Sequence, residues 1–223
     1  MHRARISSLQ WIVYLGGWLP FLWLCWAAAN NHLTINPIQA AEQRTGQFAL
    51  IFLLLSLAAT PANTLFGFRQ AIRVRRALGL FAFFYAALHF SIFIGIDYSF
   101  DWTQILETIT QKRYIVVGFS ALIILVSLAA TSFKWWMAKL GKNWKILHRL
   151  IYLAAPLVIL HFAWARKGDI FRLSGDVFAP ALAGLILVIL LILRIPPVRR
   201  TASNLQKRIR MPRLFQPPAT SGH

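Results

Sequence analysis

The stretch ALGLFAFFYAALHFSIFIGI, which runs from Ala77 to Ile96, contains twenty residues and no Asp, Glu, Lys or Arg. A helix of about 20 apolar residues crosses the ~30 Å hydrocarbon core of a bilayer. Five further runs of the chain share this character. We therefore predict an all-α membrane protein, a six-transmembrane-helix bundle with the spans Leu9–Ala29, Gly46–Leu65, Ala77–Ile96, Tyr114–Phe133, Ile146–Ala165 and Val177–Leu193.

The composition of the 223-residue chain favours a membrane protein over a soluble domain. Hydrophobic residues make up 58% and charged residues only 13% of the sequence, and the mean hydropathy is +0.58. We divide the chain into a transmembrane domain, residues 1–195, and a basic tail, residues 196–223, which we expect to be disordered and cytoplasmic. The single cysteine, Cys25, allows no internal disulfide.

The charges are distributed unequally between the two ends of the predicted spans. The N-terminus, residues 66–76, residues 134–149 and the segment from Arg194 onward together carry 18 Lys or Arg and no acid. The loops on the opposite side hold all six acids of the chain, balanced by six basic residues. Basic loops are retained in the cytoplasm, so we predict that both termini are cytoplasmic.

The formal net charge of +18 does not indicate a nucleic-acid-binding protein. The basic residues flank hydrophobic spans, where they set the orientation of the chain and attract anionic lipid headgroups. We therefore expect membrane lipid, and no nucleic acid, as the partner of this surface.

Two short motifs occur twice in the chain. Ser-Leu-Ala-Ala-Thr occurs at residues 56–60 and 127–131, and Leu-His-Phe occurs at residues 88–90 and 160–162. The offsets are 71 and 72 residues. We therefore predict an internal parallel repeat, in which the second and third helices correspond to the fourth and fifth. A parallel repeat has its pseudo-twofold axis along the membrane normal, which would place the two histidines at equal depth on opposite sides of a central site.

A histidine within a membrane helix is costly and rare, so it marks a functional site by default. His89 and His161 therefore predict one bound group held from two sides, and the best candidate is a haem iron. Cofactor sites in helical bundles are built from side chains on facing helices. The sequence contains no Cys-x-x-Cys-His motif, so the predicted haem is of the non-covalent b type. Two imidazoles fill both axial positions, which favours electron transfer over chemistry on a bound substrate.

A third histidine, His148, lies at the opposite end of the fifth span, 13 residues before His161. This separation corresponds to ~20 Å along a helix, which suits two haems stacked across a membrane. On an ideal helix the two side chains point roughly 140° apart, but Pro156 between them can break the register. The repeat pairs His148 with Arg76, so a second haem would need an unusual ligand, such as Arg75 or Arg76. Both arginines are also candidates for binding haem propionates or a flavin phosphate. The alternative is an interfacial histidine in a basic loop.

Several motifs of the chain together resemble a known family. They are Thr45-Gly46, Thr60-Pro61, Leu78-Gly79-Leu80, Tyr85-Ala86-Ala87-Leu88-His89-Phe90, Lys112-Arg113-Tyr114, Leu128-Ala129-Ala130-Thr131-Ser132, Trp144-Lys145-Ile146-Leu147-His148-Arg149-Leu150-Ile151-Tyr152 and His161-Phe162-Ala163-Trp164. Over roughly residues 9–195, the chain resembles the ferric-reductase-type transmembrane cytochrome b superfamily. Within it, the chain is similar to the haem-binding membrane subunits of bacterial periplasmic methionine sulfoxide reductase systems.

The resemblance implies haem b, in one copy or two, and FMN as cofactors. It implies that the protein relays electrons from a quinol or a cytoplasmic flavin reductase to a periplasmic, molybdopterin-containing methionine sulfoxide reductase catalytic subunit, which repairs oxidised periplasmic proteins. The location would be the bacterial inner (cytoplasmic) membrane. Ferric reductase and NADPH oxidase relatives usually carry two histidines on each of two helices and a fused flavin and nicotinamide domain. This chain departs from both patterns, which favours a separate electron-supplying partner.

Two other functions fit the same sequence. A stand-alone reductase of ferric or cupric ions would use the same haem but would need no partner protein. A haem-free transporter or assembly factor would use the intramembrane histidines for proton coupling. In the favoured interpretation, the chain is an electron-transfer subunit of an oxidoreductase system, and the reaction on the substrate takes place in its partner.

Overall fold

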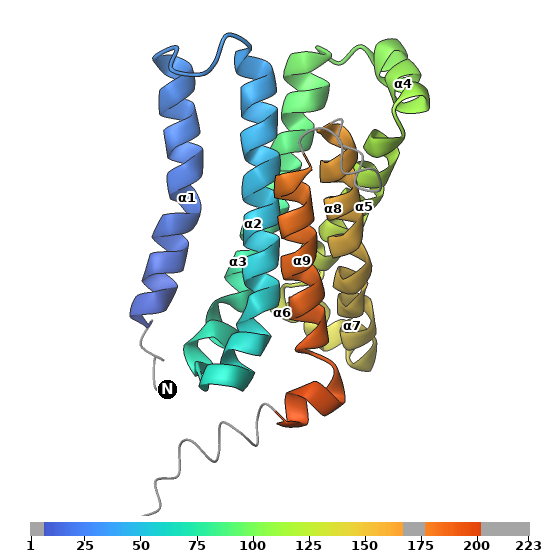
Figure 1. Ribbon diagram of the computed structural model, residues 1–223. Helices are drawn as coiled ribbons and strands as arrows, with labels where there is room; N and C mark the ends of the chain where they lie inside the picture. Colours follow the sequence, from blue (N-terminus) through green and yellow to red (C-terminus); the bar gives the residue numbers. More distant parts are fainter. Residues whose placement is uncertain (1–6, 167–176, 202–223) are drawn as a thin grey trace, which may run out of the picture.

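The computed structural model describes residues 7–166 and 177–201, and every regular element in these two ranges is helical. Figure 1 shows the helices standing side by side as a bundle. Five segments are long and apolar enough to cross a membrane, so the chain is a multi-pass membrane protein. They are Ser8–Ala29 (α1), Pro37–Phe66 (α2), Arg69–Asp97 (which begins with α3, Arg69–Ile92), Arg113–Ala130 (α5) and Lys142–Ala165 (which ends with α8, Ile151–Ala165).

The sixth predicted span, Val177–Leu193, corresponds to α9 (Phe178–Ile192), which is apolar but has only 15 residues. At 1.5 Å per residue it is about 22 Å long, which is shorter than the ~30 Å hydrocarbon core. Residues 196–201 form a further short helix. The rest of the tail, residues 202–223, for which we predict disorder, lies outside the described residues.

Local sequence signals mark the start of α1 and both ends of α2. Ser7 begins α1 with a capping box, in which its side chain accepts a hydrogen bond from the Gln10 backbone while the Gln10 side chain accepts one from the Ser7 backbone. Asn36 caps α2 in the same position, and Pro37 follows at the first helical residue. Gly67 ends α2 in the left-handed conformation, with φ of 67°.

The connections from α3 to α5 and from α5 to α8 contain helical segments. A π-helical turn (Phe93–Asp97) follows α3, and α4 (Trp102–Gln111) precedes α5. Two short helices, α6 (Lys134–Leu140) and α7 (Lys142–Leu147), follow α5. The predicted fifth span is not one ideal α-helix, because a 3₁₀ turn at His148–Leu150 separates the end of α7 from α8. A 3₁₀ turn has 3.0 residues per turn. The angle between His148 and His161 therefore differs from that expected for a continuous α-helix.

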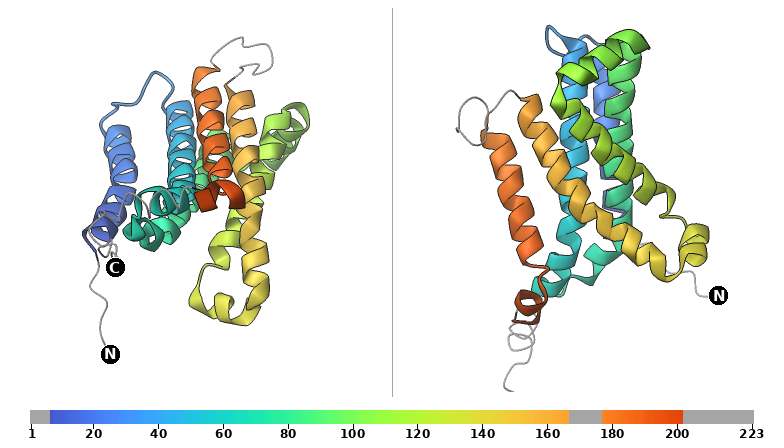
Figure 2. Two further views of the ribbon diagram at one scale, coloured as in Figure 1. Left: turned by 60° about the horizontal axis from the view of Figure 1, so that its bottom comes forward. Right: turned by 90° about the vertical axis from the view of Figure 1, so that its right-hand side faces the viewer.

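The long helices form two closely packed pairs, α2 with α3 and α5 with α8. The pairs meet where α3 contacts α5, while α9 packs on α8 and α2, and α1 lies outermost against α3 (Figures 1 and 2). One end of the bundle, which we call the acidic end, contains α4 and the N-terminus of α2. We call the opposite end, with α6, α7 and residues 194–201, the basic end. The acids of the described residues lie at the acidic end and are Glu42, Asp97, Asp101 and Glu107.

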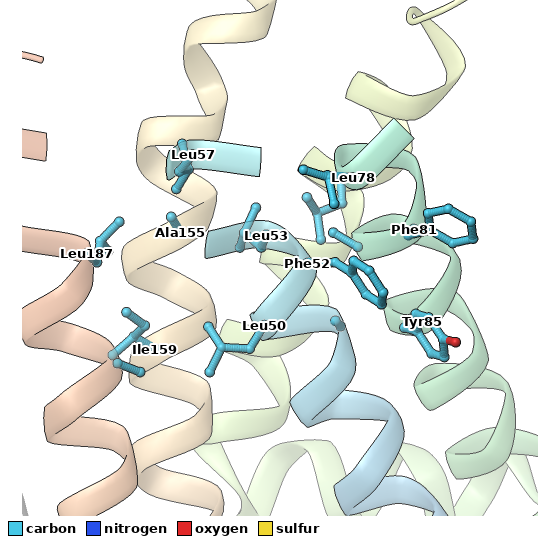
Figure 3. Packing of buried hydrophobic residues seen from close by; sticks show 14 of the residues in the cluster. Leu50, Phe52, Leu53, Leu57, Leu78, Phe81, Tyr85, Ala155, Ile159 and Leu187 are labelled. Carbon is cyan, nitrogen blue, oxygen red and sulfur yellow. The ribbon is translucent and has the colours of Figure 1, made fainter. Parts of the chain in front are cut away.

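The interior is packed with apolar side chains from α2, α3, α5, α8 and α9, most of which Figure 3 shows. Aromatic rings from α2 and α3 pack against each other, and the rings of Phe52 and Tyr85 stack with their centroids 5.4 Å apart. Small residues line the other interfaces, and Ala82, Ala154 and Ala163 are fully buried. Because lipid is as apolar as the core, helices in a membrane associate by close packing rather than by hydrophobic burial. The alanines allow that close packing.

The hydroxyl of Tyr85 attaches α1 to the bundle. It accepts a hydrogen bond from the Phe21 backbone N–H (3.0 Å) and donates one to the Gly17 carbonyl (2.7 Å). An undisturbed helix would pair these two backbone groups with each other, but Pro20 lies between them and distorts the helix. Tyr85 thus satisfies polar groups that the proline exposes within an apolar interior.

Candidate functional site

The structure brings His89 and His161 together near the acidic end. His89 lies in the last turn of α3, and His161 lies near the end of α8. Their ring centroids are 6.0 Å apart, and the two ring planes are inclined by 76°. The structure therefore brings these two predicted site residues together.

Each of the two rings is held by a backbone carbonyl on the neighbouring helix. Nδ1–H of His89 donates to the Glu42 carbonyl in α2 (2.9 Å), and Nδ1–H of His161 donates to the Tyr114 carbonyl in α5 (2.8 Å). In both cases the carbonyl lies 47 residues before the histidine. A carbonyl can only accept, so each neutral ring carries its proton on Nδ1 and presents an unprotonated Nε2. This is the tautomer in which Nε2 can bind a metal ion.

A glycine one helical turn after each carbonyl makes room for the ring. A Cβ built on Gly118 would lie 2.5 Å from Nδ1 of His161, and one built on Gly46 would lie 3.5 Å from Nδ1 of His89. A Cβ at Gly118 would therefore overlap the His161 ring, whereas a Cβ at Gly46 would make an ordinary van der Waals contact with the His89 ring. Sequence reasoning missed this role, although Gly46 and Gly118 share the 72-residue offset of the two histidines.

The spacing of the two rings fits axial ligation of a haem iron. Metal–imidazole bonds of about 2 Å on both sides of one metal ion place the ring centroids roughly 6 Å apart. The described residues contain no group of three or more His, Cys, Asp or Glu side chains that could hold a metal ion on its own. A metal between His89 and His161 would thus need further ligands from a prosthetic group, and a porphyrin supplies four. The described residues therefore fit a haem at this position.

His148 lies away from this pair, at the basic end. Its Nδ1–H donates to the Trp144 carbonyl (3.2 Å), and its ring lies 4.1 Å from the Trp144 ring. Its Nε2 is buried and has no hydrogen-bond partner within the residues that the structure describes. Arg75 is close enough to His148 for an electrostatic interaction, whereas the Arg76 side chain is exposed. The structure thus brings His148 and Arg75 together and leaves Arg76 at the surface.

Arg194 is a polar residue of the basic end that sequence reasoning missed. Its guanidinium donates to the Tyr152 hydroxyl (2.8 Å) and to the Leu57 carbonyl. Four residues after Leu57, α2 contains Pro61, which has no N–H and cannot donate to that carbonyl. Arg194 replaces the missing donor and so ties the end of α9 to α2 and α8. A proline in a helix predicts an unpaired carbonyl, but it does not say which side chain will reach it.

Comparisons with known proteins identify the family. Residues 44–159 match the family described as ferric reductase like transmembrane component. A relative from Bordetella parapertussis is 39% identical over 186 residues, which cover 83% of this chain and 88% of the relative. A relative from Rhodospirillum rubrum is 43% identical over 203 residues, which cover 91% of this chain and 94% of the relative. One from Xanthomonas euvesicatoria pv. vesicatoria is 41% identical over 223 residues, with coverage of 99% and 93%.

All three relatives bear the name protein-methionine-sulfoxide reductase heme-binding subunit MsrQ. The family match at residues 44–159 includes His89 and His148 but ends just before His161. The match to the Xanthomonas relative extends over 99% of the chain and so takes in the whole bundle. The chain belongs to the MsrQ family of protein-methionine-sulfoxide reductase heme-binding subunits, among the ferric reductase like transmembrane proteins.

Proposed function

We propose that the chain is a transmembrane b-type cytochrome that relays electrons from a donor at the basic end to a methionine sulfoxide reductase subunit at the acidic end. His89 and His161 would hold the iron of its haem. The observation that carries this proposal is the matched pair of imidazoles, 6.0 Å apart, each with Nδ1 bound to a backbone carbonyl. The names of the relatives support both the haem and the reductase system.

The protein side chains prepare the ligands rather than perform the redox chemistry. The haem, when bound, supplies one-electron transfer at its iron. The Glu42 and Tyr114 carbonyls hold the rings in one orientation and increase the basicity of Nε2. Both rings are partly buried, so there is little water to compete for the metal. With both histidines bound to the iron, the site would favour electron transfer over binding of oxygen or substrate.

The correspondence between the two ligand sets supports the internal repeat. Three pairs of residues share the offset of 72, and each pair has the same role in its half of the bundle. Each half has a carbonyl acceptor, a glycine against the ring and an imidazole. The pairs are Glu42 with Tyr114, Gly46 with Gly118, and His89 with His161.

A second redox group at the basic end is part of the proposal. In it, the buried Nε2 of His148 would hold a second haem, or Arg75 nearby would bind the phosphate of a flavin such as FMN. Arg76, the other candidate ligand, is exposed, so we assign it to the surface that faces the electron donor. This arrangement places a donor-side group and the His89–His161 pair at opposite ends of α8.

We further propose that the basic end faces the cytoplasm, that α9 is the sixth span and that the protein lies in the bacterial inner membrane. The arginine and lysine residues of the basic end support this orientation. The donor would then be a quinol or a cytoplasmic flavin reductase. The acceptor would be a periplasmic, molybdopterin-containing catalytic subunit that repairs oxidised proteins. The donor and the acceptor would then lie on opposite sides of the bilayer, as electron transfer across a membrane requires.

One kinetic experiment separates this function from that of a metal reductase. The purified, reduced protein is mixed anaerobically with its catalytic partner and methionine sulfoxide, or with ferric citrate alone, and haem absorbance is followed. The proposal predicts rapid reoxidation only when partner and methionine sulfoxide are both present. Equal reoxidation by ferric citrate without the partner would favour the stand-alone reductase. A colourless protein would favour the haem-free transporter.

A further inference from the structure

We propose that the catalytic subunit docks at the edge of the acidic end, on an apolar patch formed by Ile96, Phe100, Trp102 and Leu106. We call these four residues the α4 patch. The proposal rests on the electron-relay function proposed above and adds the surface on which the acceptor binds. All four side chains are more than half exposed, and Figure 1 shows α4 at the outer edge of the bundle.

The bundle covers only part of the apolar face of α4. The apolar residues of this helix are Trp102, Ile105, Leu106 and Ile109, which is the spacing of a single helical face. Ile105 is buried, whereas Trp102 and Leu106 are exposed and lie one turn apart. Exposed apolar side chains that gather beside polar ones mark interaction surfaces. The α4 patch therefore has room for a partner.

The charges around the patch favour a protein partner over lipid. Between His89 and Lys112 the sequence contains no basic residue, although the net charge of the whole chain is +18. The same stretch contains Asp97, Asp101 and Glu107. Anionic lipid headgroups attract basic segments, so they would be repelled here. A protein surface with an apolar centre and a basic rim is complementary to this stretch.

The segment that carries the patch begins beside the histidine pair. The π-helical turn Phe93–Asp97 starts four residues after His89. Asp97, at the end of this turn, is close enough to the Tyr114 side chain for an electrostatic interaction. The backbone carbonyl of Tyr114 holds the ring of His161. A protein bound at the α4 patch would thus lie beside the elements that hold both rings, which is where electrons must leave the relay.

A strained turn holds one residue of the patch in place. Ser99 and Phe100 have positive φ values of 46° and 61°, a conformation that residues other than glycine rarely adopt. Such strain is concentrated at functional sites. The ring of Phe100 packs over Gly95, where a Cβ would lie 3.3 Å from the ring. This packing fixes the orientation of Phe100 while the side chain stays exposed.

The size of the patch suits a short-lived complex. Electron-transfer complexes typically bury less than about 1,200 Å² in total, and an electron carrier must release its partner after each transfer. Opposite charges around a small apolar centre increase the rate of encounter and set the orientation of the partner. Salt screens such charges, so we expect binding at the α4 patch to weaken as the salt concentration rises.

The test uses the full-length, haem-loaded protein in phosphatidylcholine nanodiscs, whose neutral headgroups do not compete for a basic partner. Binding of the purified catalytic subunit is measured by biolayer interferometry at low and high salt. Asp101→Asn/Glu107→Gln removes two charges and retains an N-cap for α4, since Asn caps a helix as well as Asp. Trp102→Ala removes the largest apolar side chain of the patch. Trp135→Ala, at the basic end, is its matched control, because Trp102 is 60% and Trp135 61% exposed.

We expect the acid variant and Trp102→Ala each to bind the catalytic subunit about tenfold more weakly than the wild type at low salt. High salt should weaken wild-type binding and reduce its difference from the acid variant. Trp135→Ala should bind like the wild type. Equal affinity of the wild type and both patch variants would show that the proposal is wrong, and so would an equal loss in Trp102→Ala and Trp135→Ala.

Reoxidation of the reduced haem, followed with the same proteins, separates this proposal from the electron-relay function. If the catalytic subunit and methionine sulfoxide reoxidise the wild type and the patch variants at the same rate and bind them equally, the relay stands and the docking surface is wrong. If the variants bind weakly as expected but the bound wild type is not reoxidised, the docking surface stands and the relay is wrong. If the wild type neither binds nor is reoxidised, both proposals are wrong.

Discussion

Gly118 lies directly against the imidazole of His161, so close that a Cβ at this position would be 2.5 Å from Nδ1. The equivalent contact, between Gly46 and His89, is looser, with 3.5 Å between the corresponding atoms. Both glycines lie one turn after the carbonyl that holds the ring. The two histidine rings are thus held in the same way, but only Gly118, in α5, has no room for a methyl group.

This asymmetry predicts different effects for the same substitution. Gly118→Ala should displace the His161 ring and break its bond to the Tyr114 carbonyl. Loss of such an outer contact typically weakens metal binding 10–100-fold, so we expect a comparable loss of haem retention. Gly46→Ala places its methyl group at ordinary contact distance and should retain haem at nearly the wild-type level. Haem-to-protein ratios of the purified variants measure the difference, and equal ratios would contradict it.

The steep angle between the two rings should be visible by electron paramagnetic resonance. The planes of His89 and His161 are 76° apart. Axial imidazoles that are nearly perpendicular leave the two iron orbitals with which they interact almost equal in energy, and this gives a highly anisotropic low-spin ferric signal. We predict such a signal for the oxidised protein. A rhombic spectrum, typical of parallel imidazole planes, would show that the rings rotate when haem binds.

Removal of the Tyr85 hydroxyl should loosen α1. Tyr85→Phe leaves the Phe21 N–H and the Gly17 carbonyl without their present partner, and unsatisfied buried groups cost about 1–3 kcal/mol. We expect a loss of stability in this range, measured by denaturant titration in detergent micelles. Tyr14→Phe, at an exposed tyrosine of α1, is the matched control and should change stability by less than about 0.5 kcal/mol. Similar losses in both variants would count against the role of the hydroxyl.

The contact between Arg194 and Leu57 can be tested by restoring the missing donor. Arg194→Gln should destabilise the protein, because the Leu57 carbonyl loses its hydrogen bond. Pro61→Ala returns an N–H to α2 four residues after Leu57. In that background the cost of Arg194→Gln should fall by about 1 kcal/mol. A double-mutant cycle in denaturant titrations measures the coupling, and a coupling of zero would mean that Arg194 does not substitute for the helical donor.

The sequence was sufficient to predict the histidine pair, because an ionisable residue within an apolar run is rare and a repeated one is rarer. Of the six spans predicted from apolar run length, five correspond to segments long and apolar enough to cross a membrane, and the sixth corresponds to the shorter helix α9. The sequence did not predict the carbonyls of Glu42 and Tyr114, because a backbone group has no identity in a sequence. The position of His148 also differs from the expectation for a continuous helix, since a 3₁₀ turn contains it.

The contacts of Tyr85 and Arg194 illustrate a further limit of sequence reasoning. Pro20 and Pro61 indicate where helices α1 and α2 lose a backbone hydrogen bond. The residues that compensate lie 64 residues from Phe21 and 137 residues from Leu57. Only the packing of α3 and α9 against these helices brings them near.

The central claim is that His89 and His161 hold one haem between α3 and α8. Its most direct test is the absorption spectrum of the detergent-purified protein, first air-oxidised and then reduced with dithionite, beside His89→Ala and His161→Ala. The account predicts a sharp low-spin b-type spectrum for the wild type and loss of the spectral component from this site in both single variants. Full retention of the wild-type spectrum in either variant would contradict the claim.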